Sequence, residues 1–172
     1  MNPSQYINQT SGKDEYYTPG LIVACARAVL DTIDLDPASS EDANAVVQAK
    51  RIFTRAQDGL KKKWAGRVWL NHPFGRIQNP LWIAKLLTSF NDGHVSEALC
   101  ITYACTSESW FQPLLEYPQC FLCPRTNYYL PDGTLKRGVT KGSVVTYFGP
   151  NIDRFHRAFW QRGKIKELLI PF

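Results

Sequence analysis

The chain has 172 residues, which suits a single domain with a substantial buried core. Twenty Lys and Arg against fifteen Asp and Glu give a formal charge of +5, a modest excess that is compatible with a polyanionic partner such as DNA or RNA. No apolar run is long enough to span a bilayer and nothing resembles a signal peptide, so we expect a cytoplasmic protein without a membrane partner.

The five cysteines are an odd number and show no framework spacing. Cys120 and Cys123 form a C-x-x-C, but in an extended run their side chains would point to opposite faces. No second C-x-x-C or His pair completes a zinc site. We therefore expect free thiols in a reducing compartment and no bound metal.

Hydrophobic periodicity predicts the elements in chain order. We expect a loose, polar segment over residues 1–12 and one domain over residues 13–172. Helical spacing predicts helices over 21–30, 42–52, 80–90, 108–115 and 152–162, with Pro80 at a first helical position. Apolar runs predict strands at 33–36, 67–70, 98–103, 119–123, 128–130 and 143–148. The last two strands are expected to pair across the basic loop Pro131–Gly142, and an apolar tail follows at 168–172.

Strands that alternate with helices predict an α/β sandwich with a mainly parallel sheet, and the late hairpin adds an antiparallel edge. Two strands end in polar turns, Asp36-Pro-Ala-Ser39 and Asn71-His-Pro-Phe74. Ligands of such sheets bind beyond the carboxyl ends of the strands. If these two strands are neighbours, both turns should line one crevice.

Several short motifs occur in order between residues 14 and 160. They are Asp14-Glu-Tyr-Tyr-Thr-Pro19, Ile33-Asp-Leu-Asp-Pro-Ala-Ser39, Ala43-Asn44, Phe53-Thr54, Asp58-Gly-Leu60, Trp64-Ala-Gly-Arg-Val-Trp-Leu-Asn71 and the run 143–149. As a set they resemble the phage-type DNA N-6-adenine methyltransferase family. The resemblance implies a Rossmann-like methyltransferase fold, S-adenosylmethionine as cofactor, DNA as substrate, and the cytoplasm of a bacterium or a phage-infected cell. The length leaves no room for a separate target-recognition domain.

The resemblance assigns two segments to the methionine end of the cofactor. Tyr17-Thr18-Pro19 matches the N-terminal cofactor motif, although Thr18 could equally cap a helix that begins at Pro19. Asp36-Pro37-Ala38 stands where most methyltransferases carry a glycine-rich loop, so a strand-end carboxylate and nearby N–H groups would replace that loop. A plain Asp-Pro turn before a helix capped by Ser39 or Ser40 is the structural alternative.

Two further carboxylates are candidates for the cofactor. Asp34 lies two residues before Asp36 on the same strand face, so it is an alternative ligand. Asp58 precedes a glycine in a loop that resembles the one receiving the cofactor's adenine amine. An Asp-Gly pair is also a common turn signal.

The turn Asn71-His72-Pro73-Phe74 resembles the Asn/Asp-Pro-Pro-Tyr/Phe motif of amino-group methyltransferases. The resemblance implies that the Asn71 side-chain oxygen and the His72 carbonyl accept the two N–H groups of an exocyclic amine, which stabilises its developing charge. Phe74 would stack on a flipped base. His72 replaces the first proline of the motif, but the carbonyl is retained and Pro73 restrains the residue before it.

Basic and aromatic residues remain to be placed. Arg125, Tyr128, Lys136, Arg137 and Lys141 could contact DNA, or form a solvated loop. Lys61-Lys-Lys63 is expected in solvent, and three tryptophans, Trp64, Trp69 and Trp82, are expected in the core.

The leading hypothesis is methyl transfer from S-adenosylmethionine to the N6 amine of adenine in DNA. The alternatives are a catalytically silent cofactor- or DNA-binding protein, because of His72, and an enzyme that acts on another amino group such as cytosine N4. The sequence leaves the oligomeric state open.

Overall fold

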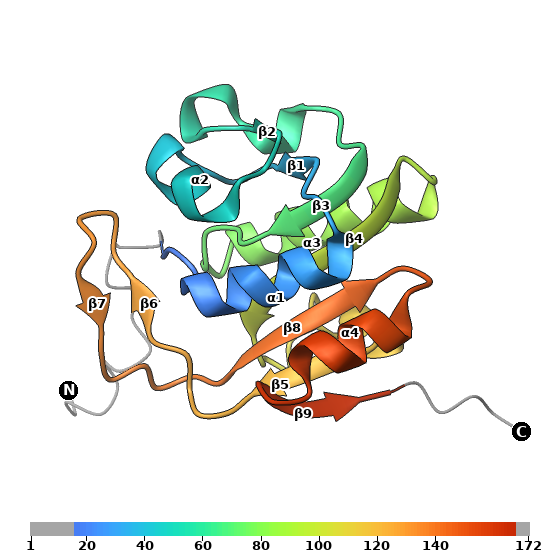
Figure 1. Ribbon diagram of the computed structural model, residues 1–172. Coiled ribbons are helices and arrows are strands. Elements are labelled where there is room, and N and C mark those ends of the chain that lie inside the picture. Colours follow the sequence, from blue (N-terminus) through green and yellow to red (C-terminus); the bar gives the residue numbers. More distant parts are fainter. Residues whose placement is uncertain (1–15, 168–172) are drawn as a thin grey trace, which may run out of the picture.

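The computed structural model describes residues 16–167, so the expected loose segment 1–12 and the apolar tail 168–172 lie outside the described residues. Seven strands form one sheet in the order β2-β1-β3-β4-β8-β5-β9 (Figure 1). Their bounds are β1 Leu35–Asp36, β2 Arg51–Ile52, β3 Gly66–Leu70, β4 Val95–Tyr103, β5 Gln119–Leu122, β8 Ser143–Phe148 and β9 Gly163–Lys166. Strands β2, β1, β3 and β4 pair in parallel, and β8 and β9 run antiparallel to their neighbours. The expected mixed α/β architecture with a mostly parallel central sheet is confirmed.

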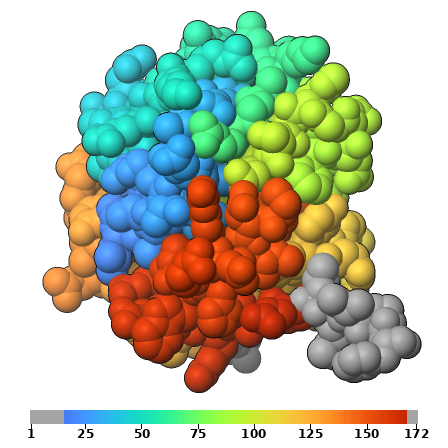
Figure 2. Space-filling view, turned by 45° about the vertical axis from the view of Figure 1, so that its right-hand side comes forward, coloured from blue at the N-terminus to red at the C-terminus, as the bar shows by residue number. Residues whose placement is uncertain are grey.

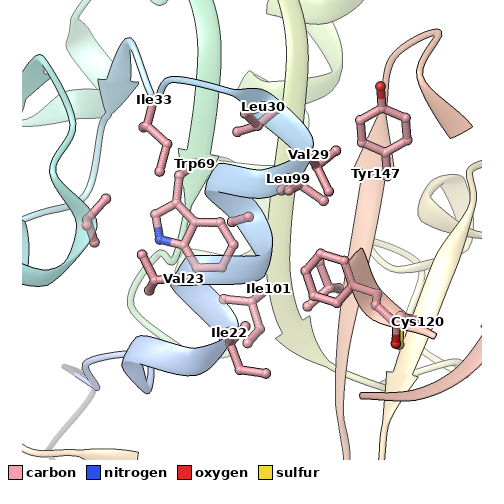
Figure 3. Packing of buried hydrophobic residues seen from close by; sticks show 14 of the residues in the cluster. Ile22, Val23, Val29, Leu30, Ile33, Trp69, Leu99, Ile101, Cys120 and Tyr147 are labelled. Carbon is pink, nitrogen blue, oxygen red and sulfur yellow. The ribbon is translucent and has the colours of Figure 1, made fainter. Parts of the chain in front are cut away.

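Helices cover both faces of the sheet. Helices α1 (Gly20–Leu30) and α4 (Ile152–Phe159) lie on one face, and α3 (Gln78–Asn91) lies on the other (Figure 1). On the face seen in Figure 2, α1 lies directly against α4. Figure 3 shows Val23 and Val29 of α1 packed toward Trp69 of β3 and Leu99 of β4. Trp64 and Trp82 are also buried, as expected, in the cluster under α3.

The late hairpin was predicted wrongly. Strand β6 (Tyr128–Tyr129) pairs with β7 (Leu135–Lys136), and these two form a separate small sheet. Strand β8 lies inside the main sheet between β4 and β5, with all six residues buried. A strand that is buried along its whole length, as β8 is, needs neighbours on both sides, which a hairpin edge does not give.

Other elements also differ from the prediction. Helix α2 (Glu41–Val47) ends early because Gln48 adopts a left-handed conformation and the Asn44 side chain holds both backbone groups of Ala49. Only a 3₁₀ turn, η4 (Gln112–Glu116), stands where a helix over 108–115 was expected. Strand β9 was not predicted. Helix α3 begins at Gln78, two residues before Pro80. Pro80 still lies in the first turn, where backbone N–H groups make no bond within the helix, so its missing N–H costs nothing there.

None of the helices within residues 16–167 has the length and apolar character to cross a membrane.

Candidate active site

The two polar turns meet at one edge of the sheet, as predicted. Strands β1 and β3 are parallel neighbours, with Leu35 opposite Val68. Asp36 ends β1, and Asn71 follows the last residue of β3, so both turns leave the sheet at its carboxyl edge. This is the edge at which open α/β sheets bind ligands.

The Asn71 side chain is held in one orientation. Its amide Nδ2 donates to the backbone carbonyl of Tyr16 at 2.6 Å. A carbonyl can only accept, so the amide oxygen Oδ1 must point the other way. Asn71 Oδ1 is buried and has no hydrogen-bond partner within residues 16–167. An unsatisfied buried acceptor costs free energy, which a ligand N–H group would recover.

His72 is buried and neutral. Burial lowers the pKa of His72 to about 4, only partly opposed by a hydrogen bond to the Pro73 carbonyl. Nδ1 lies 3.0 Å from that carbonyl oxygen, so Nδ1 carries the proton and Nε2 is an acceptor without a partner. The ring lies parallel to Trp82 with centroids 6.4 Å apart. The imidazole therefore lies on the side of the turn that faces α3. A proline at this position could make neither the ring contact with Trp82 nor the hydrogen bond to the Pro73 carbonyl.

Phe74 belongs to an aromatic cluster at this edge. Its ring contacts Tyr103 at a centroid distance of 4.6 Å, Tyr128 at 5.6 Å and Tyr16 at 6.3 Å. Phe74 itself is only 8% exposed, whereas Tyr16 and Tyr103 are half-buried. The aromatic surface nearest to solvent is thus provided by Tyr16 and Tyr103, with Phe74 behind them.

Tyr128 does not lie on the surface, so its prediction as a DNA-contacting residue is contradicted. The side chain is fully buried in the aromatic cluster, and its hydroxyl lies 2.7 Å from the Ser143 hydroxyl. The next residue, Tyr129, is exposed. In a strand, neighbouring side chains point to opposite faces, which explains why one of the two tyrosines is inside.

The N-terminal motif lies beside both turns. The Tyr17 hydroxyl is 2.7 Å from the Ser40 hydroxyl, next to the turn after β1. Helix α1 is capped by Pro19 and begins at Gly20, so the expected cap at Thr18 is not formed. The helix-capping explanation for Thr18 is therefore wrong, and its hydroxyl is buried without a partner among residues 16–167.

Asp36 is a carboxylate with few partners. It is 3% exposed and accepts a hydrogen bond from the Ala38 N–H at 3.2 Å. Burial raises the pKa of Asp36 to about 7, and the hydrogen bonds from Ala38 and Ser39 offset this only in part. The helix-cap alternative holds for Ser40, whose hydroxyl accepts from the Ala43 N–H at 3.1 Å, but it gives Asp36 no partner.

Asp34 has a different environment. It pairs with Lys50 at 2.8 Å and with Arg67 Nε at 3.3 Å, and it accepts the Arg67 backbone N–H at 2.9 Å. Burial opposes ionisation, but the bonds from Lys50 and Arg67 prevail and lower the pKa of Asp34 to about 2. Lys50 lies just before β2 and Arg67 lies near the start of β3, so Asp34 lies toward the amino edge of the sheet. Its place favours a structural role.

The Asp58 loop packs against the turn after β1. A Cβ added to Gly59 would lie 1.9 Å from the Pro37 carbonyl oxygen, so only glycine permits this approach. Asp58 itself is partly exposed and pairs with Lys61 at 2.9 Å. That hydrogen bond from Lys61 lowers the pKa of Asp58. The structure thus brings all the candidate cofactor segments except Asp34 to one edge.

The basic residues of the hairpin are exposed. Arg125, Lys136, Arg137 and Lys141 all face solvent, and Lys141 Nζ lies 5.6 Å from the Tyr103 ring centroid. The hairpin is joined to the N-terminal motif by a backbone bridge between Tyr17 and Tyr129. Lys61, Lys62 and Lys63 are exposed as expected.

Sequence reasoning missed the contributions of Tyr16, Tyr103 and Trp82 to the site. Tyr16 had a signal, since it lies within the matched motif, but its role comes from a backbone carbonyl that no side-chain pattern reveals. Tyr103 ends β4, the next strand after β3 at the same edge, which could have been inferred. Within residues 16–167, no group of three or more His, Cys, Asp or Glu could hold a metal ion.

Comparison with protein families gives one match. The model described as DNA N-6-adenine-methyltransferase (Dam) matches residues 7–120. The chain therefore belongs to the DNA N-6-adenine-methyltransferase family. The match includes every candidate residue from Tyr17 to Phe74 and ends at β5, before the basic hairpin. Comparison with curated proteins and with solved structures finds no match.

Proposed function

We propose that this chain transfers a methyl group from S-adenosylmethionine to the exocyclic N6 amine of adenine in DNA. The observation that carries the proposal is the orientation of the Asn71 amide. Its nitrogen donates to the Tyr16 carbonyl, and its buried oxygen, directed the other way, has no partner among the described residues. An acceptor with that orientation suits an amine N–H. Family membership supports adenine as the base.

The polar groups at the carboxyl edge fit the methionine part of the cofactor. Within the part of the chain that the structure describes, Asp36 is a buried carboxylate without a cationic partner, and the Thr18 hydroxyl is buried and unpaired. An ammonium group beside Asp36 would restore its ionised form, and a carboxylate could accept from the Thr18 hydroxyl. When bound, S-adenosylmethionine supplies an electrophilic methyl group on a sulfonium.

The catalytic work of the chain is orientation and charge stabilisation. The lone pair of an adenine amine is delocalised into the ring, so the amine is a poor nucleophile. Asn71 Oδ1 and the His72 carbonyl would each accept one N–H and stabilise the positive charge that develops on nitrogen. Holding the amine in line with the methyl group lowers the entropic part of the barrier.

His72 is compatible with this chemistry. Its imidazole is turned toward Trp82, and its Nδ1 donates a hydrogen bond to the Pro73 carbonyl. The ring thus restrains the turn by packing and by a hydrogen bond, where the motif's usual proline would restrain it covalently. The rings of Tyr16, Phe74 and Tyr103 would receive the target base and exclude water from it.

The test is Asn71→Ala, with methyl transfer and cofactor binding measured separately. We expect transfer to fall by at least about a hundredfold, because one acceptor for the developing charge is lost, while cofactor affinity changes by less than about threefold. Asn71→Asp keeps an acceptor oxygen and should retain more activity than the alanine variant.

Asn91→Ala is the matched control. Asn91 is exposed and ends α3, which begins after the catalytic turn and runs away from it. Its replacement should leave transfer unchanged. Unchanged turnover in Asn71→Ala would contradict the assignment.

A further inference from the structure

The loop that follows the catalytic turn carries an unusually exposed apolar side chain. Ile77 is 77% exposed, more than any other large hydrophobic residue among those described. A single exposed hydrophobic residue needs no explanation in general. Ile77 differs in its position, because it lies three residues after Phe74 and immediately before α3.

The backbone beneath Ile77 is held by hydrogen bonds. The Gly75 N–H donates to the Pro73 carbonyl at 3.1 Å, and the Asn79 N–H donates to the Gly75 carbonyl at 2.9 Å. His72 donates to the same Pro73 carbonyl. A β-branched side chain also has little freedom at χ1. Ile77 is thus a stiff apolar projection on a fixed turn, which loses little entropy when it is buried by a partner.

The residue next to Ile77 in the chain is basic. Arg76, the preceding residue, is exposed, and no acidic side chain within residues 16–167 pairs with it. The loop after β3 and the β6–β7 hairpin both lie toward the left-hand end of the sheet in Figure 1. The hairpin contributes Lys136, Arg137 and Lys141, all exposed. An apolar tip next to an exposed cation suits a polyanion with an apolar interior, which describes duplex DNA.

We propose that Ile77 enters the base stack of duplex DNA and fills the gap left when the target adenine swings out toward Asn71. The proposal rests on the proposed function and adds to it a duplex substrate and the residue that opens it. A nucleotide inside a duplex must leave the stack to reach an active site, and apolar wedges lower the cost of the gap. Arg76 would contact the phosphate next to the gap.

The experiment compares methyl transfer to one adenine presented in duplex and in single-stranded oligonucleotides of the same sequence. For Ile77→Ala, we expect transfer to the duplex to fall about tenfold or more, and transfer to the single strand to change by less than about threefold. Ile77→Leu keeps most of the apolar bulk and should restore the duplex reaction. A duplex with 2-aminopurine at the target position should lose its fluorescence increase with Ile77→Ala.

Ile152→Ala is the matched control, because Ile152 is also an exposed isoleucine at the start of a helix. It follows β8, whose end pairs with the early part of β4, so it lies at the opposite edge of the sheet. This variant should leave the duplex-to-single-strand ratio of the wild type unchanged.

Other outcomes separate the two proposals. An unchanged ratio in Ile77→Ala, with or without a general loss of activity, overturns the wedge and leaves the proposed function standing. Wild-type transfer to single strands alone overturns the wedge as well. If the wild type labels neither form of DNA, the proposed function fails and the wedge fails with it.

Discussion

Asp34 immediately precedes strand β1 and Asp36 ends it, and the environments of these two aspartates are opposite. Asp34 at the amino end is bound by Lys50 and Arg67, which hold its pKa at about 2. Asp36, two residues later at the carboxyl end, is more deeply buried and has a pKa raised to about 7. Lys50 and Arg67 complete one end, whereas no cation within residues 16–167 forms an ion pair with Asp36 at the other.

The contrast extends across the sheet. Toward the amino edge, Arg67 also donates to the Leu30 carbonyl at 2.9 Å and to the Thr32 hydroxyl. At the carboxyl edge, Thr18, Asn71 and His72 each have a buried polar atom without a partner. Native proteins satisfy nearly all buried polar groups, so such a concentration indicates a ligand site. Ion pairs thus stabilise one end of these strands, and buried polar atoms without a partner within residues 16–167 gather at the other.

The largest expected effect is at Asp36. Asp36→Asn should raise the free energy of unfolding at pH 8 by about 2–4 kcal/mol, because the folded state then buries no charge. The folded pKa lies above the unfolded one, so the penalty develops as pH rises from about 4 to 7, and the gain should disappear near pH 4. Urea unfolding at both pH values measures this.

The same variant should lose cofactor binding. In the wild type, affinity for S-adenosylmethionine should rise between pH 5.5 and 7.5 as Asp36 ionises, whereas Asp36→Asn should bind weakly at every pH in that range. Titration calorimetry measures both. A variant that keeps wild-type affinity would show that Asp36 does not hold the ammonium group. Asp92→Asn, at an exposed position, is the control for stability and binding.

A smaller effect of opposite sign is expected at the amino end. Asp34→Asn should lower the free energy of unfolding at neutral pH by about 1–2 kcal/mol, with cofactor affinity unchanged. The folded pKa is depressed, so the stabilisation is present above about pH 4 and is lost as pH falls toward 2. The difference between variant and wild type should shrink over that window in acid unfolding experiments.

Asp31→Asn is the control for Asp34. Asp31 pairs with the same Arg67 at 3.4 Å, but its side chain is 71% exposed, so its loss should have little effect. Equal losses in the two variants would contradict the account of the amino end.

The smallest effects are expected on the hairpin. Removing Lys136 or Arg137 should weaken DNA binding without changing stability, and each lost phosphate contact should reduce the slope of log K against log salt by about 0.9. Lys62→Ala and Lys63→Ala, which remove exposed cations from another loop, are the controls. DNA binding is measured at several salt concentrations. Equal effects of the Lys136 and Arg137 variants and of the Lys62 and Lys63 variants would contradict a DNA-binding role for the hairpin.

Much of the site could be predicted from the sequence. Neighbouring strands and their carboxyl edge follow from the α/β pattern, and Asn71 and Asp36 follow from their places at strand ends. What the sequence could not give is the partner of each group. Asp34 and Asp36 look alike in the sequence, and only the positions of Lys50 and Arg67 distinguish them.

The errors in the fold have a related cause. Tyr128–Leu130 and residues 143–148 both have strand character, but pairing is decided by long-range packing. The fully buried β8 fills the space between β4 and β5, and the basic loop folds back to form β7 instead. The largely apolar sequence of β8, with few polar residues and none charged, was a signal for a central strand. Tyr128 was predicted to contact DNA because it stands just before the basic loop in the sequence, but it is buried.

We propose that residues at the carboxyl edge of the sheet catalyse methyl transfer to adenine in DNA. The most direct test is to incubate the protein with S-adenosylmethionine labelled in its methyl group and DNA of mixed sequence, then to digest the DNA and identify the labelled nucleoside. The account predicts labelled N6-methyldeoxyadenosine, absent with Asn71→Ala. Labelled methylcytosine would move the acceptor, and the absence of label from a protein that binds the cofactor would contradict the claim of catalysis.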